Sequence, residues 1–109
     1  MLEALLGNTV KEQVLLYLYT YREGYAQEMR RKLNLPLRSV QLQVKRLEEA
    51  GLLVARRRDR TIVYQLNPRY PFYREIVFLL EKLLLALPQD VVEQFYTPRL
   101  RPRRIGKPL

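Results

Sequence analysis

The sequence predicts a mainly α-helical domain that carries one β-hairpin, an α+β fold class. Three observations support this prediction. Apolar residues recur at helical spacing over the first half of the chain, two β-prone runs flank a short arginine-rich segment, and a long apolar helical run follows them. With 109 residues, the chain is long enough for one compact domain with a core of its own.

The first two helices are predicted over residues 9–20 and 25–33. Thr9 and Glu12 match the capping-box pattern S/T-x-x-E, and apolar residues follow them at helical spacing. Asn34 is a suitable left-handed stop for the second helix, because Asn tolerates positive φ better than most residues other than Gly. These signals indicate two consecutive helices, the second ending just before a tight turn.

The third helix is predicted over residues 37–50, directly after Pro36, whose missing N–H costs nothing at a helix start. At about 100° per residue, Val40, Val44 and Leu47 fall on one side, which we expect to face the core. The opposite side is mostly basic and polar. It carries Arg38, Ser39, Leu42, Lys45 and Arg46.

A hairpin and a final helix complete the predicted domain. The runs LLVA (52–55) and TIVYQL (61–66) favour two strands, with RRRDR (56–60) as the tip between them. The final helix is predicted over residues 71–87, and its apolar residues cover more than half of its circumference. One buried face needs fewer, so the surplus predicts a partner subunit.

The formal net charge is +9 and the sequence pI is about 10.2, which favours a polyanionic partner. Between residues 30 and 60, ten side chains are basic and three are acidic. We expect a domain of residues 1–87 followed by an irregular, basic Pro/Arg-rich tail of residues 88–109. Two alternatives stand open for this tail: an arm along DNA, or a disordered segment that adds only nonspecific attraction.

Several classes of protein are disfavoured by what the chain lacks. It has no Cys and no His, which removes thiolate and imidazole metal ligands and the commonest general base. Ser39 is the only serine, and no Gly-rich phosphate loop is present. We therefore expect no enzyme, no metal and no other cofactor. No secretory signal and no run of about 18 apolar residues occurs, so we expect a cytoplasmic protein without a membrane partner.

The order of elements, two helices, a basic helix, a hairpin and an apolar helix, is that of a winged helix-turn-helix domain. There the third helix enters the major groove and the hairpin, or wing, reaches the backbone or minor groove of double-stranded DNA. Four like charges would repel one another on a free loop, whereas a duplex attracts them. The alternative is that the arginines only protect a sheet edge and maintain solubility. Four cations exceed that need, which favours nucleic-acid contact.

The third helix has the same two interpretations, DNA recognition or a merely solvated charged face. Its acids, Glu48 and Glu49, come only in the last turn, whereas its N-terminal half would enter the groove. This order favours recognition. For Leu42, contact with thymine methyl groups and burial against another surface are both open.

The segment SVQLQVKRLEEAGLLVARRRDRTIVYQLNP (39–68) resembles winged-helix transcription regulators of the broad ArsR and MarR type. Its most specific parts are residues 45–53 and 64–68. The continuation NPRYPFYREI is similar to small prokaryotic regulators that are often found beside nucleotidyltransferase domains. The resemblance implies a homodimer that binds specific double-stranded DNA and regulates transcription, in many relatives under control of a small ligand or metal.

Carried over by position, the resemblance implies DNA contacts from two groups of residues. The group on the third helix is Arg38, Ser39, Gln41, Leu42, Gln43, Lys45 and Arg46, and the wing group is Arg56, Arg57, Arg58 and Arg60. Relatives often have Arg where Leu42 stands, and the Cys and His ligands of metal-sensing relatives are absent, so metal sensing is not carried over.

Two further alternatives concern partners. The chain has eight tyrosines, and they could line a small-molecule effector pocket, although packing of the first helix against the final helix across a dimer explains them more simply. Four of them are Tyr17, Tyr19, Tyr21 and Tyr25. The same fold also serves as a protein-interaction module or regulatory subunit, whose basic face would dock an acidic partner.

Overall fold

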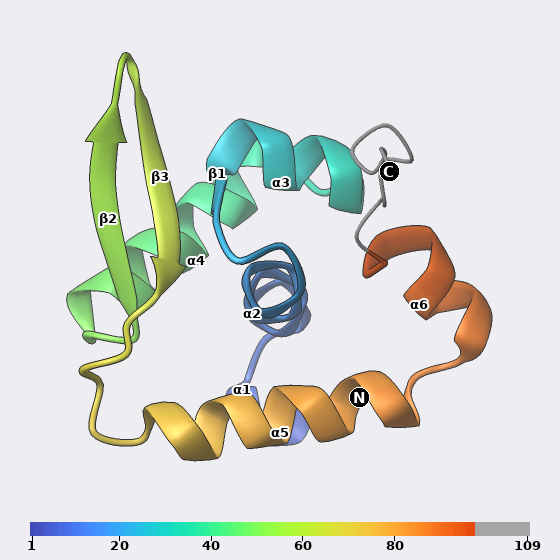
Figure 1. Ribbon diagram of the computed structural model, residues 1–109. Helices are drawn as coiled ribbons and strands as arrows, with labels where there is room; N and C mark the ends of the chain where they lie inside the picture. Colours follow the sequence, from blue (N-terminus) through green and yellow to red (C-terminus); the bar gives the residue numbers. More distant parts are fainter. Residues whose placement is uncertain (98–109) are drawn as a thin grey trace, which may run out of the picture.

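The computed structural model describes residues 1–97, which form six helices and three strands (Figure 1). In chain order these are α1 (Glu3–Leu6), α2 (Thr9–Tyr21), β1 (Gly24–Tyr25), α3 (Ala26–Leu33), α4 (Leu37–Glu49), β2 (Leu53–Arg58), β3 (Thr61–Leu66), α5 (Tyr73–Ala86) and α6 (Gln89–Phe95). The predicted fold class, mainly α with a β-hairpin wing, is confirmed.

Helix α2 is the centre of the fold. It is seen end-on in Figure 1, with α3, α4, α5 and α6 arranged around it. Five consecutive residues, 14–18, are buried. Five consecutive residues point to all sides of a helix, so α2 is buried around its whole circumference. It contacts α4, α5 and β3.

The predicted capping box at the start of α2 is wrong by one residue. Asn8 is the N-cap, and its Oδ1 accepts a hydrogen bond of 2.9 Å from the backbone N–H of Lys11. Glu12 does not bond back to the cap, because its carboxylate is buried and accepts from the backbone N–H of Leu2 at 2.6 Å. Asn is as good an N-cap as Ser or Thr, so Asn8 takes the role that Thr9 was assigned.

The turn between α3 and α4 has the predicted chemistry. Asn34 ends α3 in the left-handed conformation, with φ 58° and ψ 51°, and Pro36 precedes the first residue of α4. The backbone N–H of Leu35 donates to the carbonyl of Arg30, which closes the end of α3. The two helices are therefore joined by a short, well-defined turn, as a helix-turn-helix unit requires.

The sheet has three antiparallel strands in the order β1-β3-β2. The predicted tip, residues 56–60, is too long, because the ladder continues until Arg58 pairs with Thr61. Only Asp59 and Arg60 form the turn, and Asp59 adopts φ 56°, which Asp tolerates better than most residues. Strand β1 was not predicted from the sequence. Tyr25 is predicted as the start of a helix, but in the structure it pairs with Val63 of β3.

The prediction of an irregular chain after Pro88 is wrong for residues 89–95, which form α6. The side chain of Tyr96, just beyond this helix, is part of the hydrophobic core. The hydroxyl of Tyr21 donates to the carbonyl of Phe95 at 3.1 Å, which ties the end of α6 to α2. The core therefore extends past residue 87. The arginines of the predicted tail lie outside the described residues.

Candidate nucleic-acid interface

Helix α4 has one buried face and one exposed face. Val40, Val44 and Leu47 are buried, as the periodicity predicts. Of the predicted contact residues, Ser39 is partly exposed, and five are exposed: Arg38, Gln41, Leu42, Lys45 and Arg46. The side chain of Leu42 is 45% exposed, so within this chain it is not buried against another element. The exposed face is thus available to a partner along most of the helix.

Gln43 is placed differently from the other predicted contact residues. Gln43 is only 3% exposed, and among residues 1–97 its Oε1 has no hydrogen-bond partner. A side chain turned into the core does not reach a base edge, so the prediction that Gln43 contacts DNA does not fit its position. The other six predicted contact residues of α4 are exposed or, for Ser39, partly exposed.

The wing arginines divide between the two faces of the hairpin. Side chains alternate along a strand, and directly paired residues share a face. Arg56 pairs with Val63 and Arg58 pairs with Thr61, which puts both arginines on one face. Arg57 pairs with Ile62 and lies on the other face. All three are exposed, and Arg60 is exposed in the turn.

An unpredicted residue, Glu23, binds both arginines of the first face. Arg58 donates from Nη1 to Oε2 at 2.7 Å and from Nη2 to Oε1 at 3.3 Å. Arg56 donates from Nη2 to Oε1 at 3.0 Å. The hydrogen bond from Arg58 holds the pKa of the Glu23 carboxyl below its ordinary value, so the carboxylate stays ionised at neutral pH. Because the partners are 33 and 35 residues apart, no local sequence signal identifies Glu23.

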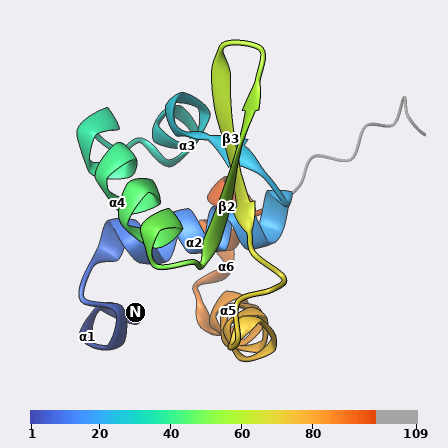
Figure 2. The same ribbon diagram turned by 90° about the vertical axis from the view of Figure 1, so that its left-hand side faces the viewer.

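The first turns of α4 and the wing tip lie in the same half of the molecule. Figure 2 shows the first turns of α4 and the tip of the hairpin on the upper side, whereas α5 lies at the bottom. Helix α3 adds Arg30, Arg31 and Lys32 in its last turn, all exposed. The concentration of basic residues after position 30 is the signal that could have identified them. This end of the domain is therefore cationic over three elements.

The tyrosines of α2 are placed mainly by packing within the chain. Tyr17 is buried, and its ring centroid lies 4.5 Å from that of Tyr21. Burial raises the pKa of the Tyr17 hydroxyl, and the nearby Glu28 carboxylate adds to the shift. A cavity of about 650 Å³ opens beside Tyr19, Tyr73 and Tyr96.

Among residues 1–97, no group of His, Cys, Asp and Glu is suited to hold a metal ion, and no helix could cross a membrane.

Comparison with known proteins identifies the fold. No family model and no curated protein sequence matches the chain. The structure of the YusO protein from Bacillus subtilis is similar over 80% of this chain and 67% of that chain, at 20% identity and a TM-score of 0.57. The transcriptional regulator BldR from Sulfolobus solfataricus is similar over 84% and 66%, at 15% identity and 0.59.

A third solved structure, the transcriptional regulator Tm0710 from Thermotoga maritima, is similar over 84% of this chain and 70% of that chain, with 21% identity and a TM-score of 0.55. The chain thus spans about two thirds of the length of these proteins. Identity at this level establishes the architecture alone. The chain has the winged helix-turn-helix fold that these structures share.

Proposed function

We propose that the protein is a transcription regulator that binds specific sites in double-stranded DNA as a homodimer. The carrying observation is that the first turns of α4 and the tip of the wing lie in the same half of the domain, and both elements expose basic side chains. In winged helices this arrangement puts the helix in the major groove and the hairpin on the adjacent backbone or minor groove. The two similar proteins whose names describe transcriptional regulators support the proposal.

On α4, the proposed roles follow from the chemistry of each side chain and its place along the helix. Arg38 and Gln41, in the first turns, can make paired hydrogen bonds to base edges, and Leu42 can contact a thymine methyl group. Ser39, Lys45 and Arg46 can bind phosphates, which position the helix without reading sequence. The acids of α4, Glu48 and Glu49, stand at its far end, where they do not oppose entry of the first turns.

The wing contributes phosphate contacts through Arg57 and Arg60, which have no ion pair among the described residues. Each phosphate neutralised by a cation releases condensed counterions, which makes the affinity fall with salt. Arg56 and Arg58 can bind phosphates only when their hydrogen bonds to Glu23 break. The wing therefore supplies affinity, and α4 supplies most of the specificity.

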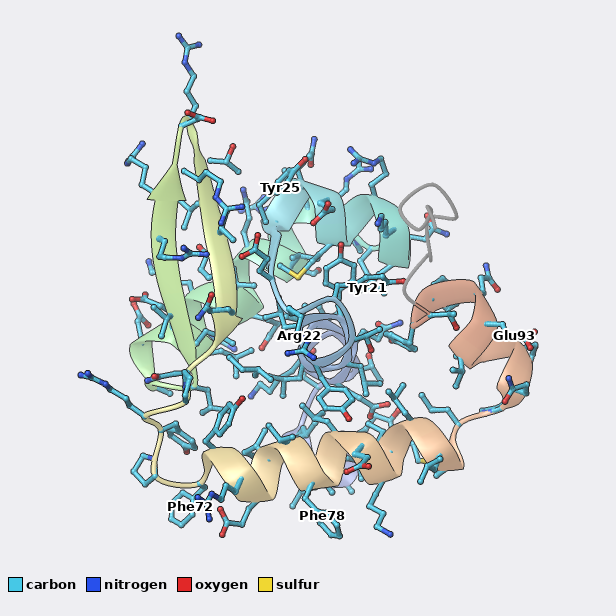
Figure 3. The ribbon with its side chains drawn as sticks, in the orientation of Figure 1. Tyr21, Arg22, Tyr25, Phe72, Phe78 and Glu93 are labelled. Atoms are coloured by element: carbon cyan, nitrogen blue, oxygen red, sulfur yellow. The ribbon has the colours of Figure 1, made fainter. Side chains whose placement is uncertain are left out.

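We place the contact surface of the proposed dimer on the outer side of α5. Phe78 and Leu85 are 59% and 78% exposed, and Figure 3 shows Phe72 and Phe78 pointing away from the domain. Large apolar side chains gathered on one face mark an interaction surface. A second copy of this chain is the simplest partner, because a two-fold dimer places two recognition helices on successive half-sites about 34 Å apart.

Other parts of the proposal rest on the resemblance to ArsR and MarR regulators. These are the ArsR-type assignment, an association with nucleotidyltransferases and control by a small molecule. A cytoplasmic location is proposed with them, because a prokaryotic transcription regulator acts in the compartment that holds the DNA. Residues 1–97 offer no Cys or His for catalysis or metal binding, and we propose no enzymatic activity.

A selection experiment tests the proposed function. The full chain is mixed with random genomic fragments at about 0.15 M salt, and the retained fragments are sequenced. The proposal predicts an enriched motif with two-fold symmetry and half-sites about one helical turn apart. Recovery of fragments without any shared motif would contradict it, and would favour the alternative in which the basic end docks an acidic protein.

A further inference from the structure

We propose that Glu23 is a positioning residue for the wing. It holds Arg56 and Arg58 on the hairpin face opposite Arg57, and so limits the charge that the wing offers to DNA. This inference rests on the proposed function and assigns a new role within it. One carboxylate, on the corner between α2 and β1, thereby sets the strength of nonspecific binding to DNA.

Glu23 binds two arginines of the wing through both of its carboxylate oxygens. Three hydrogen bonds from two guanidinium groups converge on the two carboxylate oxygens, at 2.7, 3.0 and 3.3 Å. The pair with Arg58 is bidentate, the arrangement that fixes a guanidinium group in orientation as well as in place. Gln65, on β3, lies within 3.5 Å of Arg56 and supports the same orientation.

The backbone around Glu23 is shaped to bring this carboxylate over the hairpin. Arg22, labelled in Figure 3, follows the last residue of α2. Its φ is 78°, a conformation that costs energy for a residue other than Gly. At Gly24, a Cβ would lie 2.7 Å from the Tyr17 ring, so only Gly lets the chain pass this close to α2. Pairing of Gly24 with Tyr64 then fixes the corner against β3.

Stability is a poor explanation for this arrangement. The Glu23 side chain is 37% exposed and the arginines about half exposed, and ion pairs of this kind contribute little to folding because water and salt screen them. The consequence for DNA binding is larger. A guanidinium group that is held by a carboxylate must leave it to bind a phosphate, and the carboxylate itself repels the phosphate.

The test compares Glu23→Gln with Glu93→Gln in the full chain. Both changes remove one negative charge, but Glu93 lies on α6, on the other side of the molecule from the wing (Figure 3). Binding to a duplex of arbitrary sequence is measured by fluorescence anisotropy over a range of salt concentrations. For Glu23→Gln we expect a salt slope steeper by about 1 to 2 and an affinity about tenfold higher at 0.15 M. For Glu93→Gln we expect the wild-type slope.

A DNA-free measurement keeps this inference separable from the proposed function. In the unbound protein, the Nη–H signals of Arg56 and Arg58, whose protons bond to Glu23, should exchange with water faster in Glu23→Gln than in wild type, and those of Arg57 should not change. If the wild type fails to bind DNA, the proposed function and this inference fall together. If it binds, an equal or shallower slope for Glu23→Gln, or unchanged exchange at Arg58, overturns this inference alone.

Discussion

Helices α4 and α5 are almost equal in length, with 13 and 14 residues, and both pack one face on the core. Their exposed faces differ in apolar content. Helix α4 exposes arginine, lysine and glutamine around a single large apolar residue, Leu42, whereas α5 exposes Phe78 and Leu85 among charged side chains of both signs. Figure 2 shows α5 at the bottom of the domain, whereas α4 begins in its upper half. This difference supports the two proposed partners, DNA for α4 and a second copy of the chain for α5.

The largest expected effect comes from placing charges on the exposed apolar residues of α5. In Phe78→Glu with Leu85→Glu, two carboxylates would be buried in the proposed dimer contact, which is strongly unfavourable. We expect a monomer by sedimentation at all practical concentrations. Affinity for the two-fold DNA site should fall at least about a hundredfold, because the two half-sites are no longer bound as one unit.

The control for this variant is Gln89→Glu with Gln94→Glu, which adds the same charge at exposed positions of α6. It should sediment like the wild type. A dimer that persists in the Phe78 and Leu85 variant would show that α5 is not the contact surface.

At the cationic end, Arg38→Ala should cost about 1 to 3 kcal/mol at one base pair of the site, because a paired contact to a base edge is lost. Preference at the other positions should stay the same. The measurement is anisotropy with single-base variants of the selected site. Arg69→Ala, which removes an exposed arginine beyond β3, is the matched control and should leave all preferences intact. A uniform loss over all sites would instead assign Arg38 to a phosphate.

A smaller effect concerns stability, at Gln43 of α4. Replacing it with Met removes the unsatisfied buried Oε1 at similar volume, and we expect a gain of about 1 kcal/mol in the free energy of unfolding. Urea denaturation measures this change. DNA affinity should be unchanged, since the side chain is buried. Loss of base preference in Gln43→Met would show that Gln43 turns outward when DNA is bound.

The smallest expected effect is the contribution of Glu23 to stability. Its pKa is lower in the folded protein than the ordinary 4.5, so its stabilising contribution is present above that pH and is lost as the pH falls through the folded value. The difference in unfolding free energy between wild type and Glu23→Gln should therefore be constant near neutral pH and disappear in acid. Denaturation at a series of pH values checks this, and a difference that grows on acidification would contradict the ion pairing.

The fold was predictable from the sequence where local signals determine structure. Helix periodicity, the left-handed stop at Asn34 and the β-prone runs around the arginines each act within a few residues. Strand β1 could not be predicted in this way, because Gly24 and Tyr25 are extended only through pairing with β3, about 40 residues later. Helix α6 was missed because its seven residues make only about two turns, too few for a periodic pattern to stand out, and Tyr96 beside it is buried by contacts with distant elements.

The candidate site was predictable in its location and less so in its details. Residues 40, 43, 44 and 47 follow the i, i+3, i+4, i+7 spacing of one helix face, so the pattern itself placed Gln43 toward the core. Its polar side chain and the resemblance suggested the opposite. The pairing of Arg56 and Arg58 with Glu23 depends on where the corner after α2 meets the hairpin, which sequence spacing does not contain.

The central claim is that α4 and the wing bind one duplex together. Its most direct test is the salt slope of three variants: Lys45→Ala with Arg46→Ala, Arg57→Ala with Arg60→Ala, and all four changes combined. The claim predicts that each pair lowers the slope by about 1.8 and that the combined variant lowers it by about 3.6. A wild-type slope in either pair would contradict it, because that element would then lie away from the DNA.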